Sequence, residues 1–301
     1  MMAKGQAKIS LGSWAFTYGP YADNPISFEH TARRLAEAGY DGIEIGGFEP
    51  HITLERYPDS RSRRALRRFL DDQGLGVSGY AADFGSTDPI TTEKRSAYLE
   101  LFSRFIEMGV DLGAPALRVD CVKSPGSIPP GDYHTAMLRL ADVWREAAAQ
   151  AETAGVAVVW EFEPAFVFNK PAEVVELVQT VGHPNFSVLF DTSHAYMCAV
   201  VGARQFGEPE TLPGGVADLL DRLKGHIGHI HLIDSDGTLY QEDTSTHAPF
   251  GEGKVDFAAL APQLRSIPGT GWWCVDLCFW PGAWELVEPS LRFVRDLQRI
   301  E

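Results

Sequence analysis

The feature that most constrains this chain is a regular alternation between short apolar runs and longer stretches with helical periodicity. Eight runs rich in β-branched and apolar residues have the composition of buried strands, and they begin at Lys8, Gly42, Gly76, Ala116, Val156, Phe186, Ile227 and Trp272. Strands that alternate with helices form parallel sheets, because each helix carries the chain back to the start of the next strand. The alternation therefore predicts an α/β fold.

Segments with helical spacing of apolar residues lie between these runs, and several of them end at a glycine. Glycine readily adopts the left-handed conformation that closes a helix, and proline is tolerated in the first turn. These signals predict helices at Ser27–Ala38 before Gly39, Thr92–Met108 before Gly109, Asp132–Ala154 before Gly155, and from Pro171 up to Gly182. Eight strands and about eight helices, with no Pro/Ser-rich linker, predict one domain, residues 1–301, folded as a single (β/α)8 TIM barrel.

The main alternative fold is an open, doubly wound sheet that binds a dinucleotide. Such sheets carry a GxGxxG turn after the first strand, where the backbone approaches the pyrophosphate. No GxGxxG motif follows the first apolar run of this chain. The barrel is therefore favoured over the open sheet.

The composition excludes several classes of protein. Lys and Arg number 26 against 41 Asp and Glu, a formal charge of −15, and an acidic surface repels nucleic-acid phosphates. The four cysteines are too scattered for a disulfide-built fold, and Cys274 and Cys278 are expected to be small buried side chains. The N-terminal sequence lacks a signal-like apolar core, and no run approaches about 18 apolar residues. We therefore expect a soluble, cytoplasmic protein with no nucleic-acid or membrane partner; a homo-oligomer is compatible with the sequence.

Ionisable side chains collect near the ends of the apolar runs. They are Glu44, Asp83, Arg118, Asp120, Glu161, Glu163, Asp191, His194, His229, His231, Asp234 and Asp276. In a TIM barrel the carboxyl ends of the strands form one face, where the chemistry takes place. Charges in apolar surroundings are costly unless they are paired or bind a metal. Carboxylates and imidazoles from four consecutive strands therefore predict a divalent metal site, for which Mn²⁺, Mg²⁺, Co²⁺ and Zn²⁺ all suit the donors.

Some of these residues allow a second interpretation. Glu44 and Arg118 either contact a substrate or form a structural ion pair across the barrel mouth. His229 shares a strand face with His231, and is expected to be an interior histidine with its hydrogen bonds satisfied. Glu163 is expected to contact substrate or support a ligand rather than bind the metal directly. Four aromatic residues near strand ends either stack on a sugar or pack the barrel rim: Trp14, Phe16, Trp160 and Trp280.

Five segments together resemble a known family. They are GYDGIEI (39–45), GVAVVWEFEP (155–164), LFDTSHA (189–195), HIHLIDSDG (229–237) and HAPFGEGKVDF (247–257). The chain is similar in these segments to the xylose isomerase-like TIM-barrel superfamily of sugar isomerases and epimerases, and the resemblance extends over nearly its whole length. That superfamily also contains inosose dehydratases, lyase-type subunits that act on oxidised glycosides, and apurinic DNA-repair endonucleases.

The resemblance implies specific roles. Glu161, Asp191 and His231 match metal-binding residues of the superfamily, and His194 matches a histidine that contacts substrate. The fourth ligand of ketose epimerases is a glutamate after the last strand, whereas this chain has Asp276, whose shorter side chain weakens the case for a second base. His247 stands where some relatives have an additional ligand or substrate-binding group.

The expected function is divalent-metal-dependent isomerisation or epimerisation of a small-molecule sugar or sugar derivative. The metal, with Mn²⁺ as the first choice, would polarise a carbonyl and a neighbouring hydroxyl group. Glu161 or Asp276 would remove the proton between them and give an enediolate. The residues expected to contact the substrate are His194, Glu163, His247, Arg118, Glu44 and Trp14.

Three other functions are alternatives to this one. A metal-dependent lyase or dehydratase would expel a leaving group instead of returning the proton, and Asp276 favours it, since one base and a separate acid such as His194 would suffice. A non-catalytic sugar-binding barrel would keep the fold without the metal. A DNA-repair nuclease is disfavoured, because the net charge is −15 and His51 is the only histidine soon after the second apolar run.

The segment Ser235–Lys254 is longer than the usual connection between a strand and a helix. It contains Gly237, Gly251 and Gly253 among polar residues, and the glycines are expected to give it the conformational freedom to move. Long loops on barrels commonly cover active sites. We expect it to fold across the barrel mouth and bring His247 towards the metal. The alternative is a surface loop that mediates contacts between subunits.

Overall fold

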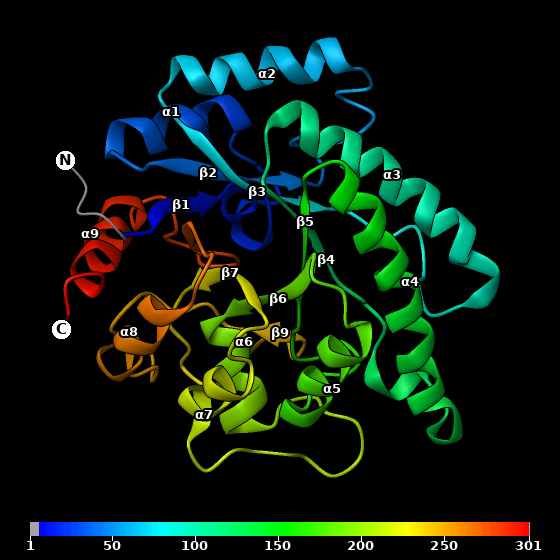
Figure 1. Ribbon diagram of the computed structural model, residues 1–301. Coiled ribbons are helices and arrows are strands. Elements are labelled where there is room, and N and C mark those ends of the chain that lie inside the picture. The colour runs from blue at the N-terminus through cyan, green and yellow to red at the C-terminus, as the bar shows by residue number, and fades with distance from the viewer. Residues whose placement is uncertain (1–5, 301) are drawn as a thin grey trace.

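A closed barrel of eight parallel strands forms the centre of the molecule, and helices surround it (Figure 1). The computed structural model describes residues 6–300. Around the barrel the strands follow the order β1-β10-β7-β6-β5-β4-β3-β2. The barrel strands are β1 (Lys8–Gly12), β2 (Gly42–Gly47), β3 (Gly76–Ala82), β4 (Ala116–Val119), β5 (Ala157–Glu161), β6 (Phe186–Asp191), β7 (Ile227–Leu232) and β10 (Trp272–Val275).

The α-helices follow the strands along the chain and pack outside the barrel (Figure 1). They are α1 (Phe28–Ala38), α2 (Ser60–Asp72), α3 (Arg95–Leu112), α4 (Tyr133–Thr153), α5 (Pro171–Val181), α6 (Thr192–Tyr196), α7 (Gly215–Arg222), α8 (Phe257–Ser266) and α9 (Val287–Leu297). Two short strands, β8 (Leu239–Tyr240) and β9 (Thr244–Ser245), form an antiparallel hairpin between β7 and α8.

The predicted (β/α)8 TIM barrel is confirmed. Seven of the eight barrel strands begin at the predicted residue, and β5 begins at Ala157, one residue after Val156. The helix signals also hold at several ends: the side chain of Ser27 accepts a hydrogen bond from the His30 N–H at the start of α1, and Gly39 closes that helix at φ 90°. The helix ends were predictable from these residues because capping depends only on the local backbone and the side chain next to it.

The predicted bounds of α3 are wrong. A 3₁₀ turn covers Thr92–Lys94, the α-helix begins at Arg95 and it continues to Leu112, so that Gly109 lies inside it. Met108 and Leu112 are four residues apart and both are buried, so packing on one helix face carries the helix past the glycine. Gly113, at φ 68°, is the residue that ends it.

Large aromatic side chains fill the space between barrel and helices. Trp160 on β5 packs against Trp144 on α4 with ring centroids 5.5 Å apart, and both are buried. Phe16 is fully buried against Tyr21 and Trp284. Phe16 and Trp160 therefore pack the core, and Trp280 is partly buried against it, which leaves Trp14 as the aromatic residue of these four to consider at the site. Within residues 6–300, no helix has both the length and the apolar character needed to cross a membrane.

Candidate metal centre

Four potential metal ligands converge at the carboxyl ends of adjacent strands. Glu161 ends β5, Asp191 ends β6, His231 lies on β7, and Asp276 directly follows β10. One donor atom from each residue lies within 4.8 Å of the donors from the other three, and all four side chains are buried. The closed barrel explains the convergence, because it brings the ends of these neighbouring strands to one rim.

The donor atoms that face one another lack other partners. Glu161 Oε1, Asp191 Oδ2 and His231 Nδ1 are buried and have no hydrogen-bond partner among residues 6–300. His231 Nδ1 lies 3.0 Å from Glu161 Oε1 and 3.6 Å from Asp276 Oδ2. Buried polar atoms without partners are costly, and carboxylate oxygens with one imidazole nitrogen form a common donor set for divalent cations. The residues present therefore fit a divalent metal ion.

In each of the three carboxylates, the second oxygen is held by an N–H donor. Arg118 Nη1 donates to Glu161 Oε2 at 2.5 Å, the backbone N–H of His194 donates to Asp191 Oδ1 at 2.8 Å, and both Trp14 Nε1 and the Cys278 N–H donate to Asp276 Oδ1 at 3.0 Å. These bonds fix the orientation of each carboxylate. One oxygen of each is left for the centre.

Charge is concentrated at this centre. Burial raises the pKa of the Asp191 carboxyl, and the carboxylates of Asp276 and Glu161 raise it further, to about 7. Burial also opposes ionisation of Glu161, but Arg118 and then His231 lower its pKa to about 2. Carboxylates this close repel one another, and a bound cation would relieve that repulsion.

Two further histidines stand beside the four ligands. His194 Nδ1 lies 2.8 Å from Ser245 Oγ, and burial lowers the pKa of His194 to about 3. His247 is buried, and neither of its ring nitrogens has a hydrogen-bond partner among residues 6–300; its Nδ1 lies 3.5 Å from Asp276 Oδ1. Donor atoms of Asp191, His194 and His247 also lie within 4.8 Å of one another. Both histidines therefore lie next to the candidate metal centre.

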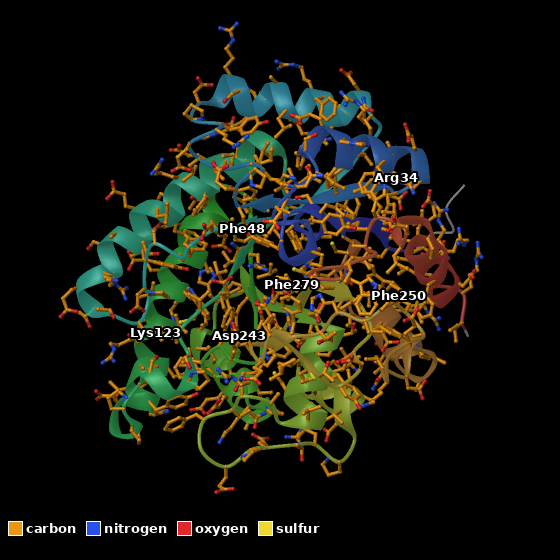
Figure 2. The ribbon with its side chains drawn as sticks, turned by 180° about the vertical axis from the view of Figure 1, so that it is seen from behind. Arg34, Phe48, Lys123, Asp243, Phe250 and Phe279 are labelled. Atoms are coloured by element: carbon orange, nitrogen blue, oxygen red, sulfur yellow. The ribbon has the colours of Figure 1, made fainter. Side chains whose placement is uncertain are left out.

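A cavity of about 270 Å³ opens above these side chains. It is lined by the buried side chains of Glu161, His194, His247 and Asp276 and by more exposed aromatic and acidic residues. Phe48, Asp243 and Phe279 are among the latter (Figure 2). The volume is near the lower end of the roughly 300–1,000 Å³ typical of small-molecule sites, so the cavity suits a small ligand.

Most of the residues expected to contact substrate line this cavity. They are His194, Glu163, His247, Arg118 and Trp14. Glu163 Oε2 accepts a hydrogen bond from the Thr244 hydroxyl at 2.9 Å and lies 3.7 Å from His194 Nε2. Burial and the neighbouring Glu161 raise the pKa of Glu163 to about 8.

Glu44 is the exception, because it does not line the cavity. Its side chain is buried and both of its oxygens lie 3.2 Å from His231 Nε2, on the opposite side of that ring from the other ligands. The alternative interpretation, an ion pair with Arg118, is wrong: Arg118 pairs with Asp120 at 2.9 Å and with Glu161. Residue type and position near a strand end could not distinguish these orientations.

Several cavity residues were not identified from the sequence. Tyr18, Phe48 and Phe279 each follow a barrel strand by a few residues, Thr244 lies on the short strand β9, and Cys278 lies in the loop after β10. The three aromatic residues could have been identified from the sequence, because each comes soon after a predicted strand. Thr244 and Cys278 could not, because their roles depend on loop conformation.

The segment between β7 and α8 folds over the open end of the barrel. Asp243, Thr244 and His247 line the cavity, and the Ser193 hydroxyl donates to the carbonyl of Thr246 at 3.1 Å. The hairpin of β8 and β9 lies in this segment. The segment therefore contributes directly to the walls of the cavity.

Asp234 anchors this segment to the end of β7. Its buried carboxylate accepts four backbone N–H groups: Oδ1 accepts from Ser235 at 2.8 Å and Val255 at 3.0 Å, and Oδ2 from Gly251 at 2.9 Å and Gly253 at 3.1 Å. The two glycines were expected to provide freedom of movement. In the structure, their backbone N–H groups instead tie the segment down.

Several known proteins are similar to this chain. The chain is 24% identical over 263 residues to fructoselysine 3-epimerase of Shigella flexneri, with 84% of this chain and 86% of the relative covered. It is 23% identical over 297 residues to inosose dehydratase of Lacticaseibacillus casei, with 89% of each chain covered. The solved structure of the IOLI protein with a bound zinc atom superposes with a TM-score of 0.70 at 19% identity, covering 96% of both chains.

The family model of the xylose isomerase-like TIM barrel matches residues 32–297. That range contains seven of the eight barrel strands and all four converging ligands. The sequence match and the closed barrel agree, and this chain belongs to the xylose isomerase-like TIM-barrel family.

Proposed function

We propose that this chain is a divalent-metal-dependent isomerase or epimerase of a small-molecule sugar or sugar derivative. The observation that carries the proposal is a set of three buried donor atoms, on Glu161, Asp191 and His231, that have no hydrogen-bond partner among residues 6–300. Of these three residues, Glu161 lines the cavity of about 270 Å³. Relatives named as a fructoselysine 3-epimerase and an inosose dehydratase support a sugar or sugar-like substrate.

Glu161, Asp191, His231 and Asp276 would hold the cation. A divalent cation bound there supplies a Lewis acid that polarises a substrate carbonyl and an adjacent hydroxyl and favours an enediolate. We propose Mn²⁺ as the native metal, since three of the four donors are carboxylates, which suit hard cations. Mg²⁺, Co²⁺ and Zn²⁺ also fit this donor set, and the related IOLI protein holds zinc.

Glu161 and Asp276 are the proposed proton-transfer residues. Each has one oxygen turned to the other ligands and a second bonded to a residue of the cavity wall, Arg118 or Trp14. A carboxylate held in this way keeps its orientation while it takes or returns a proton. Return of the proton to the opposite face of the same carbon gives an epimer, and return to the neighbouring carbon gives an isomer.

The remaining cavity residues would orient the sugar. Arg118 and Glu163 present charged or hydrogen-bonding groups on one side, and His194 and His247 present imidazole nitrogens near the ligands. The Trp14 indole forms part of the wall and is fixed by its bond to Asp276. These contacts suit a polyhydroxylated substrate, because each hydroxyl both donates and accepts hydrogen bonds.

One observation favours a second candidate, a metal-dependent lyase or dehydratase. Asp276 Oδ1 accepts from two N–H groups, Trp14 Nε1 and the Cys278 backbone, both at 3.0 Å. A carboxylate held by two donors is restricted as a mobile base, so Glu161 would then act alone. A single base suits proton removal followed by loss of a leaving group.

Hydrogen exchange in D₂O tests the proposal. The purified protein loaded with Mn²⁺ is incubated with ketoses, inososes and 3-oxo-glycosides, and products are analysed by NMR and mass spectrometry. We expect deuterium at a sugar carbon, together with an epimer or isomer; loss of water or an alcohol would instead support the lyase.

Glu161→Gln is the matched variant, because the amide keeps the size of the side chain but removes the carboxylate that would both take the proton and help to hold the metal. Its exchange rate is expected to fall by about 10²-fold or more. Metal-loaded wild-type protein that exchanges no hydrogen with any of the three substrate classes would contradict the proposal and favour a non-catalytic sugar-binding barrel.

A further inference from the structure

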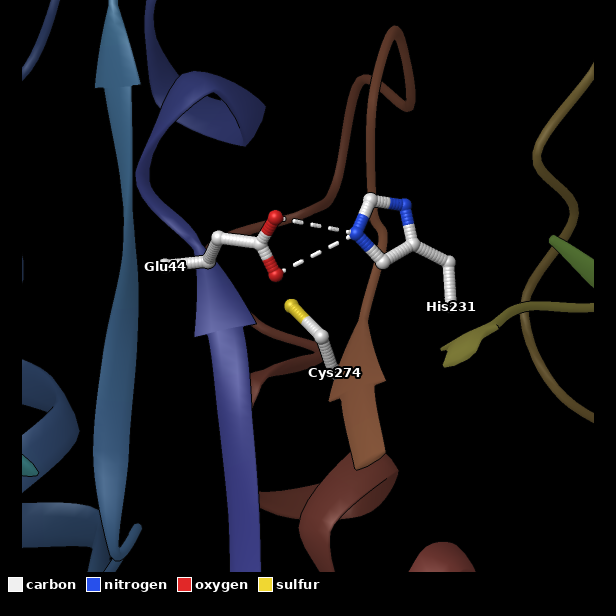
Figure 3. Close-up of side chains that lie close together, drawn as sticks. All are labelled: Glu44, His231 and Cys274. Atoms are coloured by element: carbon white, nitrogen blue, oxygen red, sulfur yellow. Dashed lines mark hydrogen bonds and ion pairs between the residues drawn. The ribbon is translucent and has the colours of Figure 1, made fainter. Parts of the chain in front are cut away.

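A buried carboxylate lies directly behind the metal-facing imidazole. Glu44, on β2, is 1% exposed and is aimed at His231 on β7 from across the barrel interior (Figure 3). Its two oxygens lie 3.2 Å from His231 Nε2, while Nδ1 of the same ring faces Glu161 and Asp276. The two ring nitrogens therefore have separate neighbours.

The pairing decides which nitrogen is available to a cation. An ionised carboxylate only accepts hydrogen bonds, so the nitrogen bonded to Glu44 must carry the proton. A neutral imidazole that carries its proton on Nε2 has its lone pair on Nδ1, the atom with no hydrogen-bond partner among residues 6–300. Glu44 thus favours the form of His231 that can bind a metal at this centre.

A second histidine fixes Glu44 itself. His229 Nε2 lies 2.6 Å from Glu44 Oε2, and the rings of His229 and His231 meet edge-on with centroids 5.4 Å apart. His229 is therefore the interior histidine with a satisfied hydrogen bond that its place on the strand predicted. Its contact leaves Glu44 little freedom to turn away from His231.

The barrel is locally irregular where these residues lie. The pairing of β2 with β3 shifts register between Ile43 and Glu44, so that Glu44 pairs with Gly79. The pairing of β6 with β7 shifts in the same way, and Leu189 pairs with His229. Register shifts of this kind redirect side chains. A Cβ on Gly79 would lie 3.2 Å from Glu44 Oε1, so glycine leaves the room that the carboxylate occupies.

Glu44, His231 and Cys274 could themselves be regarded as a metal site, since their donor atoms lie within 4.8 Å of one another (Figure 3). The hydrogen bonds oppose this. Both Glu44 oxygens are already bonded to imidazoles, and Cys274 Sγ lies 3.6 Å from the Val275 carbonyl as a thiol donor. Cys274 therefore serves as a neighbour without a role in orienting His231.

We propose that Glu44, braced by His229, is a positioning residue that holds His231 through Nε2–H and presents Nδ1 to the divalent cation. This inference rests on the metal centre of the proposed function. Residues that orient a metal-binding histidine in this way commonly change metal affinity by about 10–100-fold when replaced.

The test compares Co²⁺ affinity in three full-length variants. Glu44→Gln keeps the shape of the side chain but removes its charge and leaves one acceptor oxygen in place of two. Glu44→Leu accepts from neither imidazole, and Cys274→Ala keeps the hydrogen bonds of Glu44 to both histidines. Titration calorimetry and the visible absorption of bound Co²⁺ measure affinity and ligand geometry, and thermal unfolding without metal shows whether each variant is folded.

We expect Co²⁺ affinity to fall by about 10-fold in Glu44→Gln and by up to about 100-fold in Glu44→Leu, with an altered absorption spectrum, and to stay unchanged in Cys274→Ala. In the Zn²⁺-loaded wild-type protein, ¹⁵N NMR should show the proton of His231 on Nε2. Wild-type affinity in folded Glu44→Gln, or a proton on Nδ1, would overturn the role of Glu44 alone. Wild-type protein that binds no Co²⁺ would overturn the metal centre as well.

Discussion

At the scale of single residues, the metal centre depends on the two oxygens of each carboxylate having different partners. Glu161, Asp191 and Asp276 each give one oxygen to an N–H donor and turn the other to the common point. The sequence indicated these residues because they end strands. It could not indicate that Trp14 donates to Asp276, because this contact depends on the 3₁₀ turn Ser13–Phe16 that carries the indole back over the barrel.

Trp14→Phe tests this arrangement. The substitution keeps an aromatic ring but removes the Nε1–H, so Asp276 Oδ1 retains only the Cys278 N–H. We expect Co²⁺ affinity about 10-fold lower, measured by calorimetry. Trp280→Phe is the matched control, since Trp280 does not line the cavity. Equal Co²⁺ affinity in the two variants would show that the indole N–H does not orient Asp276.

At the scale of elements, strand positions were predictable and several details of helices and loops were not. The strands follow from local apolar runs, which are long enough to be recognised individually. The end of α3 depends instead on the burial of Met108 and Leu112, and the orientation of Glu44 depends on its contacts with His229 and His231 on β7. Such tertiary effects override local signals.

A pair of glycine substitutions tests where α3 ends. Gly109 lies inside the helix, and its Cβ would meet only Val156 at 4.0 Å, so Gly109→Ala should stabilise the protein by about 0.5–1 kcal/mol. Gly113 has φ 68°, and Gly113→Ala should destabilise it by about 1–2 kcal/mol. Denaturant unfolding measures both. Destabilisation by Gly109→Ala together with stabilisation by Gly113→Ala would mean that the helix ends at Gly109.

The segment between β7 and α8 gives a second prediction at this scale. A Cβ on Gly253 would lie 2.2 Å from Asp234 Oδ1, within the group that anchors the segment. We expect Gly253→Ala to lose about 1–3 kcal/mol of stability and to lower turnover, because His247 belongs to the same segment. Gly131→Ala, with no atom within 4 Å of the added Cβ, is the control. Unchanged thermal unfolding and turnover in Gly253→Ala would contradict the role of Asp234 in anchoring the segment.

At the scale of the whole molecule, closure of the barrel brings residues from the ends of successive strands together into the candidate metal centre. Glu161 and Asp276 are far apart in sequence, yet strands β5, β6, β7 and β10 are neighbours in the barrel. The order of strand-end residues was enough to predict a metal site built from four consecutive strands, and the family resemblance then indicated Glu161, Asp191 and His231 within it. The walls of the cavity were less predictable, since Tyr18, Phe48 and Phe279 belong to loops whose paths the strand pattern does not determine.

The accumulation of buried carboxylates also affects stability of the whole fold. A metal that binds only the folded state should stabilise it by about 2.7 kcal/mol when free metal is 100 times the dissociation constant. We expect Mn²⁺ to raise the unfolding temperature and EDTA to lower it again. Asp191→Asn keeps an acceptor for the His194 N–H but loses the anionic oxygen, so it should respond weakly to both. An equal response in this variant would assign the stabilisation to another site.

The most direct test of the metal centre is anomalous diffraction from crystals of the wild-type protein grown with Mn²⁺. The account predicts one strong anomalous peak at about 2.0–2.6 Å from a donor atom of each of Glu161, Asp191, His231 and Asp276. It also predicts that the His231 donor is Nδ1, with Nε2 still facing Glu44. A cavity without a peak, or a peak bound by other residues, would contradict it.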